Sequence, residues 1–122
     1  MVAAAMALAG CESTNSLEPN QVTVVNLSDD FSFSVTALDN VSDGEQHLWG
    51  MTGTQVEVDV TQSISSGNAI LQIRDGGGTV VYQENIGDAV DSTFAGLTGL
   101  WQVDVVLTKV SGEFSFTILR VP

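Results

Sequence analysis

Alternation of apolar and polar side chains with a period of two runs through most of the chain and restricts its fold more than any other feature. Five segments show it, with the apolar members Phe31, Phe33 and Val35; Val56, Val58 and Val60; Ala69, Leu71 and Ile73; Trp101, Val103 and Val105; and Phe114, Phe116 and Ile118. Successive side chains of a β-strand point to opposite faces, so each segment predicts a strand with one face on a core and one in water.

Residues that tolerate a positive φ separate these segments: Asp43-Gly44, Ser66-Gly67-Asn68, Asp75-Gly76-Gly77-Gly78, the stretch 96–99, and Ser111-Gly112. Short strands joined by Gly-rich turns predict an all-β fold, an antiparallel, jelly-roll-like β-sandwich of eight or nine short strands. We expect this domain to span residues 21–122. Asp75 to Gly78 lacks the Lys of a phosphate-binding loop and is expected to be a hairpin loop.

Composition narrows the classes of partner. The chain has 122 residues, 43% of them hydrophobic, which fits one domain with a buried core. Fifteen acidic side chains against three basic ones give a net charge of -12, which excludes nucleic acid and electrostatic docking on anionic lipid. One Cys and one His are too few for an internal disulfide or a zinc site.

The N-terminus carries a short motif behind an apolar, uncharged stretch: Leu8-Ala9-Gly10-Cys11. It resembles the lipobox of bacterial lipoproteins, in which the chain is cut before a Cys that then carries lipid. The resemblance implies a signal peptide over residues 1–10, with its basic start missing, and a lipidated Cys11 followed by a polar tether over residues 11–20. An apolar segment with an ordinary buried Cys is the alternative. Ten residues are too few for a transmembrane span, which needs about 20.

Residue Glu12 follows the Cys, where many lipoproteins retained at the inner membrane have Asp. The resemblance therefore implies the bacterial outer membrane or the cell surface, with the membrane as a partner through the anchor on Cys11. Several acyl chains, at about 0.8 kcal/mol per buried methylene, would hold the domain almost permanently.

The second half of the chain, residues 54–118, is similar in rhythm to bacterial pre-peptidase C-terminal domains. Asn68-Ala69, Asp75-Gly76 and Leu100-Trp101 stand where that family has a small residue before a strand, a turn and an aromatic strand. Catalysis in that family belongs to a neighbouring protease domain. The resemblance implies a jelly-roll-like binding or accessory module.

Catalytic groups are sparse. His47 is the sole imidazole and has Asp43 and Glu45 near it in sequence, but no Gly-x-Ser-x-Gly elbow accompanies it. Glu57 and Asp59 share one strand face, where solvated carboxylates are expected rather than an acid and base pair. We therefore expect no enzymatic activity.

No cofactor is expected, and calcium is the alternative that the acidic residues leave open. Asp39, Asp43 and Glu45 lie in a predicted loop where hard oxygen ligands converge readily. The spacing does not fit an EF-hand, because Gly50 stands where the final Glu is required. Ordinary turn residues are the competing interpretation.

Two tryptophans are candidates for a sugar-stacking surface. Trp101 continues the core-facing set of its strand and is expected to be buried. Trp49 alternates less cleanly and precedes Gly50, so it is predicted to be the exposed aromatic and the ligand-binding residue.

Together these features predict a lipid-anchored β-sandwich of the cell envelope that acts as a non-enzymatic binding or accessory module. Its partner is expected to be a protein or a glycan. The alternative is a carbohydrate-binding surface lipoprotein centred on Trp49, assisted by calcium.

Overall fold

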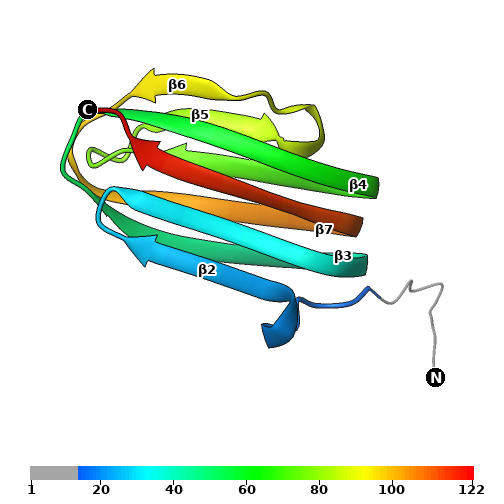
Figure 1. The fold of residues 1–122 in the computed structure, drawn as a ribbon. Helices are drawn as coiled ribbons and strands as arrows, with labels where there is room; N and C mark the ends of the chain where they lie inside the picture. The colour runs from blue at the N-terminus through cyan, green and yellow to red at the C-terminus, as the bar shows by residue number, and fades with distance from the viewer. Residues whose placement is uncertain (1–13) are drawn as a thin grey trace.

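The computed structural model describes residues 14–122. The predicted signal peptide, residues 1–10, and Cys11 lie outside the described residues. Figure 1 shows the described chain as two layers of antiparallel β-structure, one behind the other, with the C-terminus at the left end.

Strands make up nearly all of the regular structure. The strands are β2 (Val22–Leu27), β3 (Asp30–Met51), β4 (Gln55–Arg74), β5 (Val80–Asn85), β6 (Ser92–Ala95) and β7 (Gly99–Arg120). Two single-turn 3₁₀ helices, η1 (Pro19–Gln21) and η2 (Ile86–Asp88), complete the elements. The predicted all-β fold is confirmed. Within residues 14–122 no helix has the length and apolar character that a bilayer crossing requires.

The strand count is six among the described residues, not eight or nine, because three strands continue through positions expected to be turns. β3, β4 and β7 are 22, 20 and 22 residues long, and each bends sharply at bulges where its pairing register shifts. Gly67 and Gly112 sit in these bends with φ of 86° and 123°. A Cβ atom there would lie 2.2 Å from Lys109 O and 2.3 Å from Ser63 O, so only glycine fits.

Each bend carries its strand from one layer into the other. The front sheet of Figure 1 has the order β2-β3-β7-β4-β6 and uses residues 30–35 of β3, 114–120 of β7 and 55–60 of β4. The back sheet uses residues 43–51 of β3, 99–107 of β7 and 68–74 of β4, with β5 at its far edge. We call the end with the bends the bend end, and the opposite end, with the loops at 28–29, 52–54, 75–79 and 96–98, the turn end.

The core lies between the two sheets and consists of the alternating apolar sets that the sequence predicts. Its largest fully buried side chains include Trp49, Trp101, Phe31, Phe33 and Phe116. The two indoles meet edge to face with ring centroids 5.9 Å apart, and Phe33 stacks on Phe116 at 5.4 Å. Aromatic pairs in these geometries contribute about 0.5–1.5 kcal/mol beyond the area they bury.

The prediction that Trp49 is exposed is wrong. Its side chain is 0% exposed, and its indole N–H donates to Leu27 O at 2.7 Å. The prediction fails because the inward positions before Trp49 on β3 are the polar residues Asp43, Glu45 and His47. Their polarity hides the alternation that would have placed Trp49 on the inward side of the strand. They face inward at the open edge of the sandwich, where β3 is the outermost strand of the back sheet.

The N-terminal segment is attached to this edge well before β2 begins. Asn15 forms a parallel bridge with Val41, its N–H donates to Asn40 O at 2.9 Å, and its carbonyl accepts from Ser42 N at 2.9 Å. Leu17 packs against the core, and its N–H donates to the Asp43 carboxylate at 2.9 Å. The part of the predicted tether from residue 15 to residue 20 is therefore bound to the sandwich.

Candidate binding surfaces

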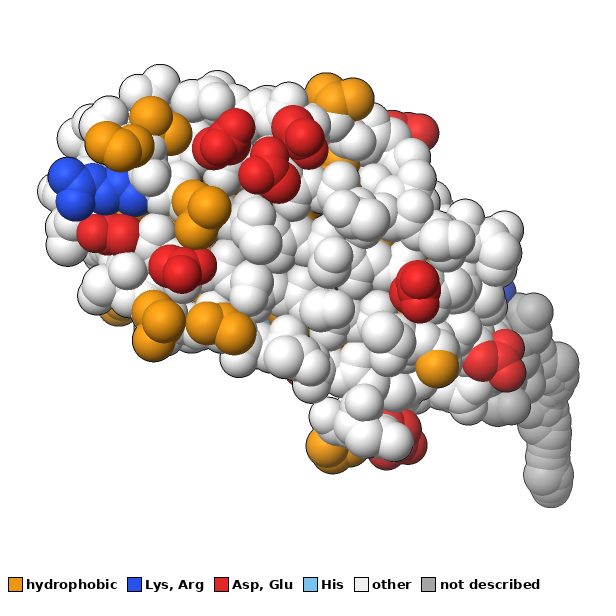
Figure 2. All heavy atoms as spheres, viewed as in Figure 1, with side chains coloured by type: hydrophobic (Ala, Val, Ile, Leu, Met, Phe, Trp, Pro, Cys, Tyr) orange, Lys and Arg blue, Asp and Glu red, His pale blue; other side chains and the backbone are white. Residues whose placement is uncertain are grey.

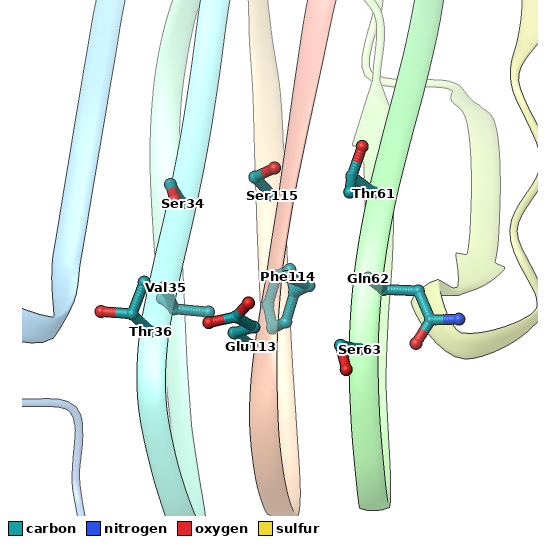
Figure 3. Close-up of a pocket in the computed structure, with 9 residues that line it drawn as sticks. All are labelled: Ser34, Val35, Thr36, Thr61, Gln62, Ser63, Glu113, Phe114 and Ser115. Atoms are coloured by element: carbon teal, nitrogen blue, oxygen red, sulfur yellow. The ribbon is translucent and has the colours of Figure 1, made fainter.

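The outer face of the front sheet carries rows of short hydroxyl side chains. Ser34 of β3 pairs with Ser115 of β7, which pairs with Thr61 of β4, and Ser32 and Thr117 continue the pattern one step along. We call these five residues the hydroxyl face. Neighbouring strands lie about 4.8 Å apart, so each row is closely spaced and nearly flat. In Figure 3, Ser34, Ser115 and Thr61 stand in one row across the three strands.

A shallow hollow of about 170 Å³ lies on this face, next to the bend end. Its walls are Thr36, Ser63 and the carboxylate of Glu113, while Val35 and Phe114 point behind the sheet into the core (Figure 3). Figure 2 shows that most of the face is uncharged, with acidic side chains gathered near β4 and β6 and basic ones at the turn end.

The outer face of the back sheet is lined by long amide side chains instead. Gln46 of β3, Asp104 of β7, Gln72 of β4 and Gln83 of β5 occupy directly paired positions on four adjacent strands. With Gln102 they line a groove of about 450 Å³. We call these five residues the amide groove. Ile70 and Val106 supply an apolar wall beside them.

Hydrogen bonds order part of the amide groove. Gln72 Nε2 donates to Gln83 Oε1 at 2.6 Å, and Gln102 Nε2 donates to Asp104 Oδ2 at 2.9 Å. The second carboxylate oxygen, Asp104 Oδ1, is buried and has no hydrogen-bond partner among residues 14–122. An unpaired buried acceptor costs about 1–3 kcal/mol, so a donor that reached it would be bound favourably.

Tyr82 has the other unpartnered buried side-chain atom found in residues 14–122, its phenolic oxygen. The ring stacks on Phe94 with centroids 5.3 Å apart, inside the sandwich. Burial raises the pKa of Tyr82 above its ordinary value of 10.0. The hydroxyl is therefore neutral at physiological pH and belongs to the core rather than to an outer face.

His47 lies on the inward side of β3 and is held by its neighbours. Its ring centroid is 5.6 Å from that of Phe31 and 6.1 Å from that of Phe33, and its Nε2 is 3.1 Å from Glu45 Oε1. A His that takes a proton from a substrate needs an open path to it. Here two phenylalanine rings and a carboxylate contact an imidazole whose side chain is 22% exposed.

The three carboxylates predicted to hold calcium have separate surroundings. Asp39 is in the β3 bend, Asp43 accepts from Leu17 N and Gly44 N at 2.9 and 2.7 Å, and Glu45 pairs with His47. In the part of the chain that the structure describes, no group of three or more His, Cys, Asp or Glu side chains is arranged to hold a metal ion. Calcium binding by Asp39, Asp43 and Glu45 stays a prediction.

Glu57 and Asp59 point outward from β4 at positions paired with β6 and β7. Asp91 lies near them, since its carboxylate accepts from Val60 N at 3.1 Å. Glu57 is exposed and Asp59 is half-buried. The pair therefore has the solvated position that the sequence predicts.

Two carboxylates at the turn end hold loops together. Asp75 accepts from the N–H groups of Leu97, Gly77 and Thr79 at 2.9 to 3.0 Å, which confirms the predicted hairpin loop and ties it to residues 96–98. Asp29 accepts from Thr52 N and Thr52 Oγ1 at 2.7 Å and lies 3.5 Å from Arg120. These bonds, led by Leu97 N–H for Asp75 and Thr52 N–H for Asp29, lower the pKa of both carboxyls.

Sequence reasoning found the core and missed the amide groove. Its glutamines come from four separate segments, and only the strand register brings them into one row. The available signal was that Gln recurs at outward positions of the strands in the back sheet, whereas Ser and Thr recur at those of the front sheet. No aromatic platform accompanies the groove, since Trp49 and Trp101 are both 0% exposed.

No protein-family model matches this chain, and no curated protein shows significant similarity to it.

Proposed function

We propose that this chain is a lipid-anchored protein of the bacterial cell envelope, held through Cys11 at the outer membrane or cell surface. Its role is that of a non-enzymatic binding or accessory module. Leu8-Ala9-Gly10-Cys11 supports the anchor, and Glu12 supports the choice of membrane.

The observation that carries the proposal is the attachment of Asn15 to the bend of β3 by three hydrogen bonds of 2.6 to 2.9 Å. Asn15 lies four positions after Cys11, and four residues span at most about 14 Å of extended chain. A lipid on Cys11 would therefore hold the bend end close to the membrane. Both outer faces would then stand beside the membrane, open to partners in the same compartment.

The contacts of the polar side chains favour binding over catalysis. His47 contacts Phe31, Phe33 and Glu45, and Asp29 and Asp75 are occupied with backbone N–H groups of loops. Nucleophilic or acid–base chemistry needs such groups to be directed at a substrate. Hydroxyls on one outer face and amides on the other offer hydrogen-bond donors and acceptors to a ligand.

Metabolic labelling of cells with an alkyne analogue of palmitate tests the anchor. We expect label on the wild-type chain and its recovery in the membrane fraction, and the loss of both in Cys11→Ser. Ser16→Ala, also in the N-terminal segment, is the control and should keep the label. A wild-type chain that carries no label would overturn the proposed anchor.

A further inference from the structure

We propose that the amide groove binds a neutral, hydroxyl-rich ligand, the sugar units of an uncharged glycan. The inference rests on the proposed function in taking the domain to be a binding module. It does not depend on lipidation of Cys11.

The first argument is the hydrogen-bonding chemistry of the groove. A primary amide offers an N–H₂ donor and a carbonyl acceptor side by side, which matches a hydroxyl that both donates and accepts. Four glutamines and one carboxylate converge there, from Gln46, Gln72, Gln83, Gln102 and Asp104. Few ligand classes other than polyols can use so many neutral donors and acceptors at once.

The second argument is the unpaired oxygen of Asp104. Asp104 Oδ1 is buried beside the groove and accepts no hydrogen bond from the described residues, while Oδ2 is occupied by Gln102. Gln46, directly paired with Asp104 on the neighbouring strand, is exposed and can move aside. A sugar hydroxyl that entered beside Gln46 would give the carboxylate the donor that it lacks, and bonds to charged groups are the stronger ones.

The third argument is the shape of the groove. The row from Gln46 to Gln83 crosses four strands, or about 14 Å at 4.8 Å per strand, so it accommodates an extended ligand better than a single small molecule. Gln72 and Gln83 are already hydrogen-bonded to each other at 2.6 Å, which reduces the side-chain entropy lost on binding. Ile70 and Val106 give the apolar C–H face of a sugar ring a surface to contact.

The net charge of the chain and its exposed side chains argue against other classes of ligand for the amide groove. A net charge of -12 opposes anionic ligands. Protein interfaces usually centre on buried aromatic or Arg anchors, yet the large hydrophobic side chains exposed in residues 14–122 are all Val or Leu. An uncharged glycan fits these limits better than a protein partner does.

The test is affinity electrophoresis of the detergent-solubilised full chain through gels that contain a neutral polysaccharide. The polysaccharides are soluble β-glucan, α-glucan, galactomannan and chitin oligomers. Calorimetric titration with the best ligand then measures the affinity. We expect retardation by at least one of them. Asp104→Ala and Gln72→Ala should each weaken binding at least about tenfold. Asp59→Ala and Thr117→Ala, at directly paired outward positions of the front sheet, are the matched controls and should leave affinity within about twofold. Asp104→Asn gives a second, isosteric variant, and unchanged melting temperatures show that each variant is folded.

Three results would overturn the inference: no retardation by any of the polysaccharides, equal weakening by the Asp59 and Asp104 variants, or retention of affinity in both groove variants. The labelling experiment on Cys11 is independent of this test. An unlabelled chain that binds glycan would overturn only the proposed anchor. A labelled chain that binds no glycan would overturn only the proposed role of the amide groove.

Discussion

The hydroxyl face and the amide groove share the strands β3, β4 and β7, to which the amide groove adds β5, yet they differ in chemistry and in the volume of their hollows. The shared strands carry Ser34, Thr61 and Ser115 outward in the front sheet and Gln46, Gln72 and Gln102 outward in the back sheet. Short side chains leave a nearly flat surface with a hollow of about 170 Å³, whereas long amides surround about 450 Å³. A bent strand can therefore carry two separate surfaces, with the change of side chain located at the bend.

The two surfaces also differ in how their polar atoms are satisfied. The hydroxyl side chains of the front sheet are exposed or half-buried, within reach of solvent. In the amide groove, side chains bond to one another, and the described residues supply no donor to Asp104 Oδ1. This difference makes the back sheet the better candidate for a specific ligand.

The largest expected effect comes from removing the core that both surfaces share. Trp49→Ala should lower the free energy of unfolding by about 3–5 kcal/mol, because it empties a fully buried site between the sheets. Leu48→Ala, which alters an adjacent side chain that is 55% exposed, should cost less than about 1 kcal/mol. Urea denaturation followed by circular dichroism measures both. Equal costs would mean that Trp49 is on the surface, as the sequence alone predicts.

The second effect tests the bend that separates the two surfaces. Gly112→Ala should destabilise the chain by about 2–3 kcal/mol, since a Cβ atom would meet Ser63 O at 2.3 Å at a φ of 123°. Gly78→Ala is the matched control, with a φ of 84° and nothing within 4 Å of the added Cβ. It should cost only the left-handed backbone penalty of about 1–2 kcal/mol. A Gly112 variant no less stable than the Gly78 variant would argue against a continuous, bent β7.

The third effect concerns the turn end, where loops from the two sheets meet. The pKa of Asp75 is held below its ordinary 3.8 by N–H donors, first that of Leu97. Its contribution to stability is therefore complete above that value and is lost as the pH falls through the folded-state pKa. Melting temperatures of the wild type should fall steeply below about pH 4.

Asp75→Asn should reduce the fall in melting temperature at acid pH. It should also lower the melting temperature at neutral pH, because the amide oxygen is a weaker acceptor than the carboxylate. Asp39→Asn, at an exposed position at the bend end, controls for the loss of one negative charge. If the melting temperatures of the wild type and of Asp75→Asn fall equally at acid pH, Asp75 does not hold the loops as described.

Much of the fold was predictable because burial imposes a period of two on each strand. Phe31, Phe33, Leu71, Ile73 and Trp101 were all placed in the core from alternation alone, and all are buried. The strand count was not predictable, because glycine with a positive φ serves a turn and a bulge equally well, and only tertiary pairing decides between them.

The candidate site was much less predictable. Trp49 was misplaced because the inward positions before it are polar at an open sheet edge. Gln46, Gln72, Gln83 and Gln102 become neighbours only through the register of four strands, which no local pattern specifies.

The smallest expected effect sharpens the contrast between the two surfaces. Ser115→Ala on the hydroxyl face should change the free energy of unfolding by no more than about 0.5 kcal/mol, because it removes one solvated hydroxyl. It should also leave retardation by polysaccharide unchanged. A loss of retardation in this variant would transfer the binding role to the front sheet.

The most direct test of the account is a nuclear magnetic resonance titration of the ¹⁵N-labelled full chain in detergent micelles with the neutral oligosaccharide that retards it best. The side-chain amide signals of Gln46, Gln72, Gln83 and Gln102 report the amide groove, and that of Gln62 reports the front-sheet hollow. We predict saturable shifts of the four groove signals with that of Gln62 unmoved. No shift in the groove signals, or an equal shift of Gln62, would contradict the assignment of the back sheet as the ligand-binding surface.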